Sequence, residues 1–534
     1  MFNLASYAAI LLAVGFQGPV QDQSQGQRQG RTGAQTGQRP QRGPATTTPA
    51  TGSESEAPAP MIEVPPSTTK HTIALSSGPI AYTAEAAQIP LRNDDGQVEC
   101  RMFSVTYTKD DADTHARPVT FAFNGGPGSA SFWLHMGAIG PKRAPMNDDG
   151  TLPAPPYQPV DNADTWLDFT DVCVIDAPGT GFSRIARPDL ASKYYGVTQD
   201  LAAFTQFIKN WLTIHRRWNS PIFIAGESYG GIRGSGLANS LFRAGVAING
   251  FVSISGTSNF MTLDGMRGND LPYISYLPSM AAVAWYHHKL GPQFKDPGSV
   301  VKEVQDWIDK EYAAALERGD SLSDAEKDHI ASKLSEYLGI SKAYCLGSNL
   351  RISSFAFFTE LLRSQRLQIG RYDGRLTGKN ELEAPPPFRG GPGGGGGPGD
   401  PSDDATTAPF TASINQYLED DLKVKTDLPY LNEGNTRPWQ EPEGSYAETA
   451  TDLRNALARN QHLRVLYCMG YYDLACPLNG TIFTINHMGL DKETRSHISF
   501  QFFPAGHMMY IEKSSRHKLH DNVRQFEADC LAGK

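Results

Sequence analysis

The sequence is poor in cysteine and lacks the spacings by which cysteine and histidine usually bind metal. Its six cysteines are Cys100, Cys173, Cys345, Cys468, Cys476 and Cys530. Neither a C-x-x-C nor an H-E-x-x-H motif occurs, so the sequence indicates neither a disulfide-built fold nor a zinc site. We expect no metal and no other cofactor, while one or two disulfide bridges remain open if the chain is exported.

A basic patch or stripe is also missing. Asp and Glu number 57 against 48 Lys and Arg, which gives a formal net charge of −9 at pH 7. A protein that binds nucleic acid usually carries clustered positive charge for the phosphate backbone. We therefore expect no nucleic-acid partner.

The N-terminal apolar run, Leu4–Phe16, lacks the length of a transmembrane helix. It has the length of the core of a secretion signal, although the usual basic flank is absent. We interpret residues 1–18 as a signal-like segment and expect an exported protein, secreted or periplasmic, without stable membrane insertion. A slipped start site or a membrane-tethering remnant are the alternatives.

Residues 21–60 contain no Val, Ile, Leu, Met or aromatic residue. Such a segment cannot bury enough apolar surface to offset the entropy lost on ordering. We expect a disordered linker over residues 19–66, and the folded region to begin at residue 67.

Strand and helix patterns alternate in the rest of the chain. His71–Thr83 and Glu99–Tyr107 are expected as antiparallel strands joined by a turn at Arg92–Gly96. Helices are expected at Val197–Arg217 and Ile232–Ala244. Six short apolar runs are typical of buried parallel strands: Arg117–Asn124, Asp171–Asp176, Pro221–Ala225, Asn249–Ser255, Leu463–Met469 and Ile498–Phe503. The pattern predicts an α/β fold whose mostly parallel central sheet is flanked by helices.

The alternation stops between residues 258 and 460, which we expect to form a largely helical cap insertion. This interval is more charged and contains expected helices at Ser299–Arg318, Ser323–Leu338 and Ile352–Arg366, with a Gly/Pro-rich mobile loop at residues 383–404. The core then comprises residues 67–257 and 461–534. An independent second domain is the alternative, but the return of strand patterns at Leu463 favours an insertion.

A G-x-S-x-G motif, Gly226–Gly230, lies between an expected strand and an expected helix. In that setting the glycines permit a sharp turn that exposes the side chain of Ser228. The motif alone is weak, because a tight turn without chemistry has the same sequence. A serine nucleophile also needs a base, and the base needs a group that fixes its tautomer.

Asp473 and His507 follow the two last expected strands, in the order Ser, acid, His that hydrolases of this architecture use. Their shared position at the carboxyl edge of the sheet predicts a catalytic triad with Ser228. Most of the thirteen histidines lie in helical or polar surroundings. His135 follows a Gly-rich loop, and we keep it as a minor candidate for lining the site.

That Gly-rich loop, Asn124–Ser129, ends an earlier expected strand. Acyl transfer needs N–H donors aimed at the developing oxyanion. We expect the amides of Gly126 and Tyr229 to form this oxyanion hole. A simple Gly-Pro turn is the alternative.

Five blocks in this order resemble the signature of the serine carboxypeptidase family of the α/β-hydrolase superfamily. They are NGGPGSAS at Asn124–Ser131, DAPGTGFS at Asp176–Ser183, GESYGG at Gly226–Gly231, GYYDLACP at Gly470–Pro477 and AGHMM at Ala505–Met509. The resemblance spans about residues 70–530. It implies an α/β-hydrolase fold and a serine-type carboxypeptidase, with Ser228 as nucleophile, Asp473 as orienting acid and His507 as base.

The resemblance also implies that Asn124, Gly125 and Glu227 bind the terminal carboxylate of a peptide substrate with a free C-terminus. Two carboxylates repel each other unless they share a proton, so we expect Glu227 to be protonated in the productive complex. A turn residue selected only for charge at a helix N-terminus is the other interpretation of Glu227.

The sequence departs from the family at three places. Ser129 stands where many members have cysteine, so that family disulfide cannot form, Ala122 replaces a frequent aromatic, and Ala138–Pro141 lacks a second acid found in some members. An esterase or acyltransferase could use the same triad, and a non-catalytic binding protein could keep the fold. Asn124 and Glu227 favour the peptidase, since a neutral ester offers them no terminal carboxylate.

Overall fold

The computed structural model describes residues 63–380, 399–442 and 445–533. The signal-like segment 1–18, nearly all of the expected linker 19–66 and most of the Gly/Pro-rich loop lie outside these residues. Among the described residues, no helix is long and apolar enough to cross a membrane.

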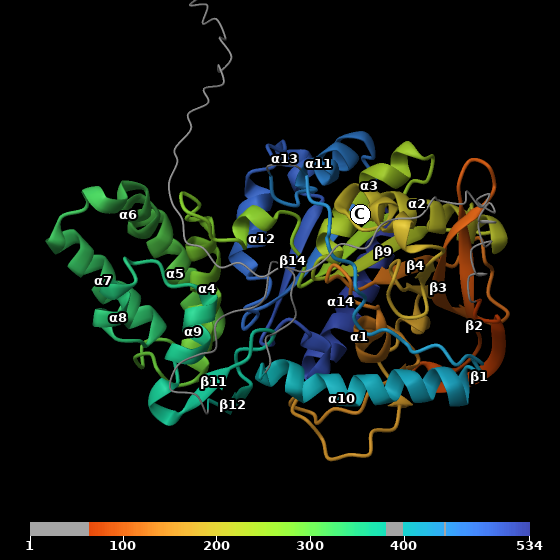
Figure 1. The fold of residues 1–534 in the computed structure, drawn as a ribbon, viewed down its shortest axis with the longest axis horizontal. Coiled ribbons are helices and arrows are strands. Elements are labelled where there is room, and N and C mark those ends of the chain that lie inside the picture. Colours follow the sequence, from red (N-terminus) through yellow and green to blue (C-terminus); the bar gives the residue numbers. More distant parts are fainter. Residues whose placement is uncertain (1–62, 381–398, 443–444, 534) are drawn as a thin grey trace, which may run out of the picture. The chain divides into compact units, whose positions relative to one another are not determined.

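One ten-stranded sheet organises the described residues (Figure 1). Its path runs β1 (Ser67–Leu75), β2 (Gly78–Arg92), β3 (Val98–Lys109), β7 (Asp171–Ile175), β4 (Val119–Phe123), β9 (Ile222–Glu227), β10 (Gly250–Ile254), β13 (Arg464–Gly470) and β14 (Ile498–Phe503). The short strand β8 (Arg184–Ile185) pairs with β3. The strands from β7 to β14 are parallel, and β1, β2 and β3 extend the sheet antiparallel.

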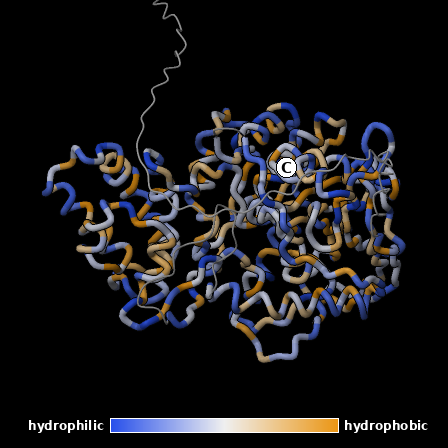
Figure 2. The backbone as a smooth tube through the Cα atoms, viewed as in Figure 1, coloured by the Kyte–Doolittle hydropathy of each residue, from blue (hydrophilic) through white to orange (hydrophobic). Residues whose placement is uncertain are grey.

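The central strands are apolar along their whole length because helices cover both faces of the sheet. Phe121 of β4 packs in one apolar cluster with Trp211 of α2 (Val197–Ile214) and Leu237 of α3 (Gly230–Arg243). Its neighbour Ala122 belongs to a second cluster with Leu519 of α14 (Lys513–Leu531). Successive side chains of a strand point to opposite faces, which separates the two clusters. Hydrophilic segments lie mainly in outer loops (Figure 2).

This sheet, covered by helices on both faces, confirms the predicted α/β-hydrolase fold. The expected parallel strands are present with ends that differ by at most two residues, and the helices expected at Val197–Arg217 and Ile232–Ala244 are α2 and α3. The single strand expected over His71–Thr83 is wrong. Residues 67–92 form the two strands β1 and β2, which turn at Ser76 and Ser77 before Gly78, whose φ is 113°.

The chain leaves the sheet after β10 and returns at β13. The intervening helices are α4 (Leu271–Tyr286), α5 (Pro297–Trp307), α6 (Ala313–Arg318), α7 (Asp324–Leu338), α8 (Lys342–Gly347), α9 (Ser354–Glu360), α10 (Pro401–Gln416) and α11 (Ala450–Arg459), with a hairpin of β11 (Leu367–Ile369) and β12 (Thr377–Lys379). Helices α4 to α9 gather beside the β14 side of the sheet, whereas α10 runs along the core (Figure 1).

Two expectations for this insertion are wrong in extent. The helix expected over Ile352–Arg366 is the shorter α9, followed by one 3₁₀ turn. The loop expected to reach residue 404 ends earlier, because Asp400 caps α10 by accepting a hydrogen bond from the Ser402 amide at 2.9 Å.

The remaining strands and α-helices are short. They are α1 (Phe132–Leu134), which continues into a π-helix at His135–Ile139, the paired β5 (Lys142–Arg143) and β6 (Val160–Asp161), α12 (Leu478–Asn486) and α13 (Lys492–Arg495).

Candidate active site

Ser228 lies on the sharp turn between β9 and α3. Its φ is 61°, a left-handed conformation that is uncommon for a residue with a side chain and costs about 1–3 kcal/mol. The backbone folds back so closely that a Cβ on Gly226 would lie 2.3 Å from the carbonyl oxygen of Gly230. The glycines of the motif therefore permit the turn, and the Ser228 amide is fixed by donating to the Ile254 carbonyl at 3.1 Å.

Asp473 and His507 meet beyond the carboxyl ends of β13 and β14. The distance between His507 Nδ1 and Asp473 Oδ2 is 2.8 Å, and both side chains are buried. The other carboxylate oxygen, Asp473 Oδ1, accepts from the amides of Ala475 and Cys476 at 2.7 and 2.9 Å. These bonds fix the carboxylate so that it faces the imidazole.

The histidine backbone is anchored from two distant segments. The His507 amide donates to the carbonyl of Tyr372 at 2.6 Å, and Ser255 Oγ donates to the His507 carbonyl at 2.7 Å. Burial acts to lower the pKa of His507, but the charge and the hydrogen bond of Asp473 outweigh burial and leave this pKa above its usual value. Asp473 therefore stabilises the imidazolium that a histidine forms when it accepts a proton as a general base.

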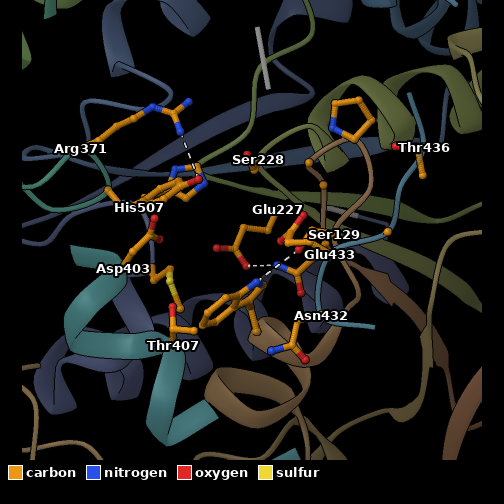
Figure 3. Close-up of a pocket in the computed structure, with 18 of the residues that line it drawn as sticks. Ser129, Glu227, Ser228, Arg371, Asp403, Thr407, Asn432, Glu433, Thr436 and His507 are labelled. Carbon is orange, nitrogen blue, oxygen red and sulfur yellow. Dashed lines mark hydrogen bonds between the residues drawn. The ribbon is translucent and has the colours of Figure 1, made fainter. Parts of the chain in front are cut away.

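Ser228 lines two cavities. The first, which we name the Glu227 cavity, has a volume of about 420 Å³ and is also lined by Asn124, Glu227 and His507 (Figure 3). The second, which we name the Tyr276 cavity, has a volume of about 460 Å³ and is lined by Tyr229, Tyr276 and other aromatic side chains. Gly126 borders both cavities, as Ser228 does.

The glycine loop after β4 closely approaches the turn that carries Ser228. A Cβ on Gly125 would lie 2.4 Å from the amide nitrogen of Tyr229, and Gly126 has a φ of 105°. The loop is held by its own side chains and by the next strand: the Ser131 hydroxyl accepts from the Asn124 amide at 3.0 Å, and Asp176 accepts from the Ser131 amide at 2.8 Å. The structure thus brings Gly126 and Tyr229, the predicted oxyanion residues, together beside Ser228.

Glu227 is buried in the floor of the Glu227 cavity. Its Oε2 accepts from Asn124 Nδ2 at 2.7 Å and from the Tyr510 hydroxyl at 2.8 Å. Burial raises the pKa of Glu227 to about 7, although the charge of His507 and these two hydrogen bonds act in the opposite direction. The carboxyl group can therefore gain or lose its proton near neutral pH.

Sequence reasoning missed a buried ion pair beneath this cavity. Arg233 Nε lies 2.7 Å from Asp200 Oδ2, both side chains are almost fully buried, and Arg233 Nη1 donates to the Asn124 carbonyl. The guanidinium stacks over Phe204 at 4.4 Å from the ring centroid. Helical periodicity places each charged residue on the apolar face of its own helix, α2 or α3, but does not show that the two residues pair.

Tyr510 and Tyr372 were also missed. Tyr510 follows the predicted histidine by three residues, and Tyr372 comes from the insertion, where no motif marks it. The Tyr372 ring lies 5.3 Å from the His507 ring. Only the folded chain reveals these contacts.

His135 does not line either cavity. Its Nε2 lies 2.6 Å from the Tyr107 hydroxyl, and burial lowers the pKa of this histidine to about 3. It is a neutral core residue, so the structure does not support this minor candidate for lining the site. All six cysteines are free, so none of the disulfide bridges left open by the sequence is formed.

Comparison with known proteins supports the resemblance. Residues 93–283 match the model of the serine carboxypeptidase family. Over 116 residues, 21% of the chain, the sequence is 35% identical to serine-type carboxypeptidase F of Aspergillus niger and 32% identical to pheromone-processing carboxypeptidase KEX1 of Cryptococcus gattii. These alignments span 19% and 16% of the two relatives.

Solved structures that match the chain include the KEX1 prohormone-processing carboxypeptidase of Saccharomyces cerevisiae, with a TM-score of 0.48 and 18% identity over 84% of this chain and 91% of that one. Proline iminopeptidase of Mycobacterium smegmatis follows, with a TM-score of 0.37 and 14% identity over 84% and 100%. The family match confirms the resemblance to serine carboxypeptidases. It contains the segments around Asn124 and Ser228 and ends before Asp473 and His507.

Proposed function

We propose that the chain is a serine-type carboxypeptidase, which hydrolyses the C-terminal peptide bond of peptides through Ser228, His507 and Asp473. The family match over residues 93–283 supports a serine peptidase. The observation that carries the proposal is the buried Glu227 carboxyl, which lies beside the nucleophile and is hydrogen-bonded to Asn124 and Tyr510. A neutral ester offers no terminal carboxylate for this carboxyl group to bind.

In the first step His507 takes the proton of the Ser228 hydroxyl while Oγ attacks the carbonyl carbon of the last peptide bond. Asp473 accepts from Nδ1–H, which leaves Nε2 as the basic nitrogen and stabilises the imidazolium. The upward shift in the pKa of His507 supports this role. The amides of Gly126 and Tyr229 donate to the oxyanion of the tetrahedral intermediate.

In the second step the C–N bond breaks, and the imidazolium gives its proton to the leaving nitrogen. The C-terminal amino acid leaves, and the remaining acyl group stays on Ser228 as an ester. A water molecule then gives its proton to His507 and attacks this ester. Breakdown of the second intermediate returns the proton to Ser228 and releases the shortened peptide.

The substrate's own carboxylate fits against Glu227 because the pair can share one proton. A Glu227 with a pKa of about 7 is largely protonated below neutral pH, so it donates to the substrate carboxylate instead of repelling it. Asn124 and Gly125 line the same cavity and complete this binding site. We assign the Glu227 cavity to the residue that leaves and the Tyr276 cavity to the residue before it.

The insertion of residues 258–460 acts in this proposal as a cap over the core parts 67–257 and 461–534. Residues of this segment line both cavities, which supports the role. Asp264 and Tyr273 line the Tyr276 cavity, and Arg371 lines both the Tyr276 and the Glu227 cavity. We also propose export of the chain, guided by the apolar run at residues 4–16.

The direct test is the release of free amino acid from an N-blocked dipeptide, with Ser228→Ala as control. The proposal predicts release by the wild type and none by the variant. Hydrolysis of simple esters without any release from the dipeptide would instead support an esterase or acyltransferase with the same triad.

A further inference from the structure

One segment of the insertion, residues 429–436, pairs with the glycine loop after β4, and we name this segment the strap. Two backbone hydrogen bonds join them, one from the Ala130 amide to the Asn432 carbonyl at 2.9 Å and one from the Gly434 amide to the Gly128 carbonyl at 2.7 Å. Between these bonds the two segments form an antiparallel bridge, beside the Glu227 cavity (Figure 3). The insertion is therefore tied directly to the loop that carries a proposed oxyanion donor.

The strap also pairs with a second loop, residues 176–183 after β7. The amides of Gly181 and Leu431 each donate to the carbonyl of the other residue, at 2.8 and 3.1 Å. The approach leaves no space for a side chain, because a Cβ on Gly434 would lie 2.2 Å from the Gly179 carbonyl oxygen. The strap thus holds both loops through their backbones.

A tyrosine of the strap reaches a carboxylate that fixes the glycine loop. The Tyr430 hydroxyl donates to Asp176 Oδ1 at 3.1 Å, and the same oxygen accepts from the Ser131 amide at 2.8 Å. The Ser131 hydroxyl in turn accepts from the Asn124 amide at 3.0 Å, at the start of the glycine loop. A continuous hydrogen-bonded path therefore leads from the strap to this loop.

Asp176 depends on its donors because it is buried. Burial raises the pKa of Asp176 to about 6, while the Ser131 amide, the Tyr430 hydroxyl, the Phe182 amide and the charge of Arg184 act in the opposite direction. A protonated carboxyl group is a weaker acceptor than a carboxylate. The Tyr430 hydroxyl therefore stabilises the form of Asp176 that holds the Ser131 amide best.

We propose that Tyr430 is a positioning residue for catalysis, which acts through Asp176 and Ser131 to fix the glycine loop so that the Gly126 amide donates to the oxyanion. Oxyanion donors stabilise the transition state only when they are held in place beforehand. A loop of glycines has many accessible backbone conformations, so it needs support from outside. The inference rests on the proposed function, because it takes the Gly126 amide as a donor of the oxyanion hole.

The first experiment measures kcat and KM of Tyr430→Phe on an N-blocked dipeptide and on an ester with the same acyl group. We expect kcat to fall about tenfold on both substrates with KM nearly unchanged, the range of one hydrogen bond to a charged group. The factor should be shared because both reactions pass through the oxyanion. A wild-type kcat, or a loss confined to KM, would overturn the inference.

Tyr344→Phe is the matched control. Tyr344 is half-buried on α8 of the same insertion, its hydroxyl forms no hydrogen bond within the described part of the chain, and it lines neither cavity. This variant should keep the wild-type kcat on both substrates. A loss as large as that of Tyr430→Phe would show that the effect does not depend on the bond to Asp176.

A second experiment tests the oxyanion hole itself with a peptide boronic acid that lacks the leaving residue. Ser228 Oγ adds to the boron while its proton passes to His507, and the tetrahedral anion places an oxygen where the oxyanion forms. The inhibition constant of Tyr430→Phe should rise by the factor by which its kcat falls. An unchanged inhibition constant would contradict the assignment.

A third variant, Gly434→Ala, displaces the strap without removing a side chain. Its Cβ would meet the Gly179 carbonyl oxygen, so kcat should fall on the dipeptide and on the ester alike. Gly347→Ala, in the same insertion, meets nothing within 4 Å and serves as its control. A folded Gly434→Ala enzyme with the wild-type kcat would contradict the role of the strap. Lack of release from the dipeptide by the wild type would instead contradict the proposed function.

Discussion

Glu227 and Tyr510 are hydrogen-bonded at 2.8 Å, although 283 residues separate them in the chain. The contact joins the residue before the nucleophile to a segment three residues beyond the predicted base. It holds a buried carboxyl group at the floor of a cavity that Ser228 and His507 also line. The fold thereby places a second carboxyl group next to the proposed triad, and its protonation should govern which substrates bind.

Glu227→Gln should change the pH dependence of peptide hydrolysis. Burial raises the pKa of Glu227 to about 7, and the proposed substrate carboxylate needs the protonated form. The kcat/KM of the wild type for a free-acid dipeptide should therefore fall as pH rises through about 7. Glutamine cannot ionise, so the variant should lose this fall. The pH profile of kcat/KM between about pH 5 and 9 measures it, and an unchanged profile would remove Glu227 from carboxylate binding.

Gly125→Ala should damage catalysis without unfolding the protein. The added Cβ would lie 2.4 Å from the Tyr229 amide nitrogen, so the proposed oxyanion hole must move. Loss of one such donor costs about 10²–10³ in kcat, which initial-rate kinetics on a blocked dipeptide measures. Gly347→Ala is the control, because a Cβ there meets nothing within 4 Å and should leave kcat unchanged. A Gly125→Ala enzyme with wild-type kcat would place the oxyanion elsewhere.

Arg233→Met should destabilise the fold around the substrate site. The substitution leaves Asp200 buried without its partner, a change that typically costs about 3–5 kcal/mol. Denaturant unfolding should show the lower free energy, and KM should rise because the Asn124 carbonyl loses its donor. Arg243→Met on the same helix is the control, since Arg243 is exposed. Equal stability of the two variants would contradict the structural role of the pair.

Glu527→Gln should make stability less dependent on pH. Glu527 is buried on α14, where Thr120 Oγ1 donates to its Oε1 at 2.8 Å and its Oε2 has no partner in the described residues. Burial raises its pKa to about 8 from an ordinary 4.5, so the folded state binds more protons between these values and loses stability as pH rises. The stability of the variant minus that of the wild type should be larger at pH 8.5 than at pH 5. Thermal unfolding of both proteins at the two pH values measures this difference. A difference that is the same at both pH values would indicate that Glu527 does not titrate in this way.

The sequence predicted the elements whose burial leaves a local pattern. The run Arg117–Asn124 contains β4, which is buried along its whole length, because strands within a parallel sheet are apolar along short, bounded stretches. Ser228, Asp473 and His507 were predicted as a triad because each follows a strand at the same edge of the sheet, and the structure places all three there. A motif and a strand end are both local, so a single sequence records them.

The rest depends on contacts between distant segments. Helix α4 was missed because it is apolar around most of its circumference, which leaves no amphipathic period. Asp403 and Glu433 come from the insertion, and no spacing in the sequence indicates that they share a cavity with Glu227. Arg233 lies close to the motif, but its partner Asp200 comes from another helix. Packing decides these relationships.

The most direct measurement compares an N-blocked dipeptide with its C-terminal amide, at about pH 6, for the wild type and for Glu227→Gln. The central claim is that a protonated Glu227 binds the free carboxylate of the leaving residue. It predicts that the wild type cleaves the free acid faster than the amide, and that the variant loses most of this difference, with Ser228→Ala inactive on both. Equal cleavage of the acid and the amide by the wild type would contradict the claim.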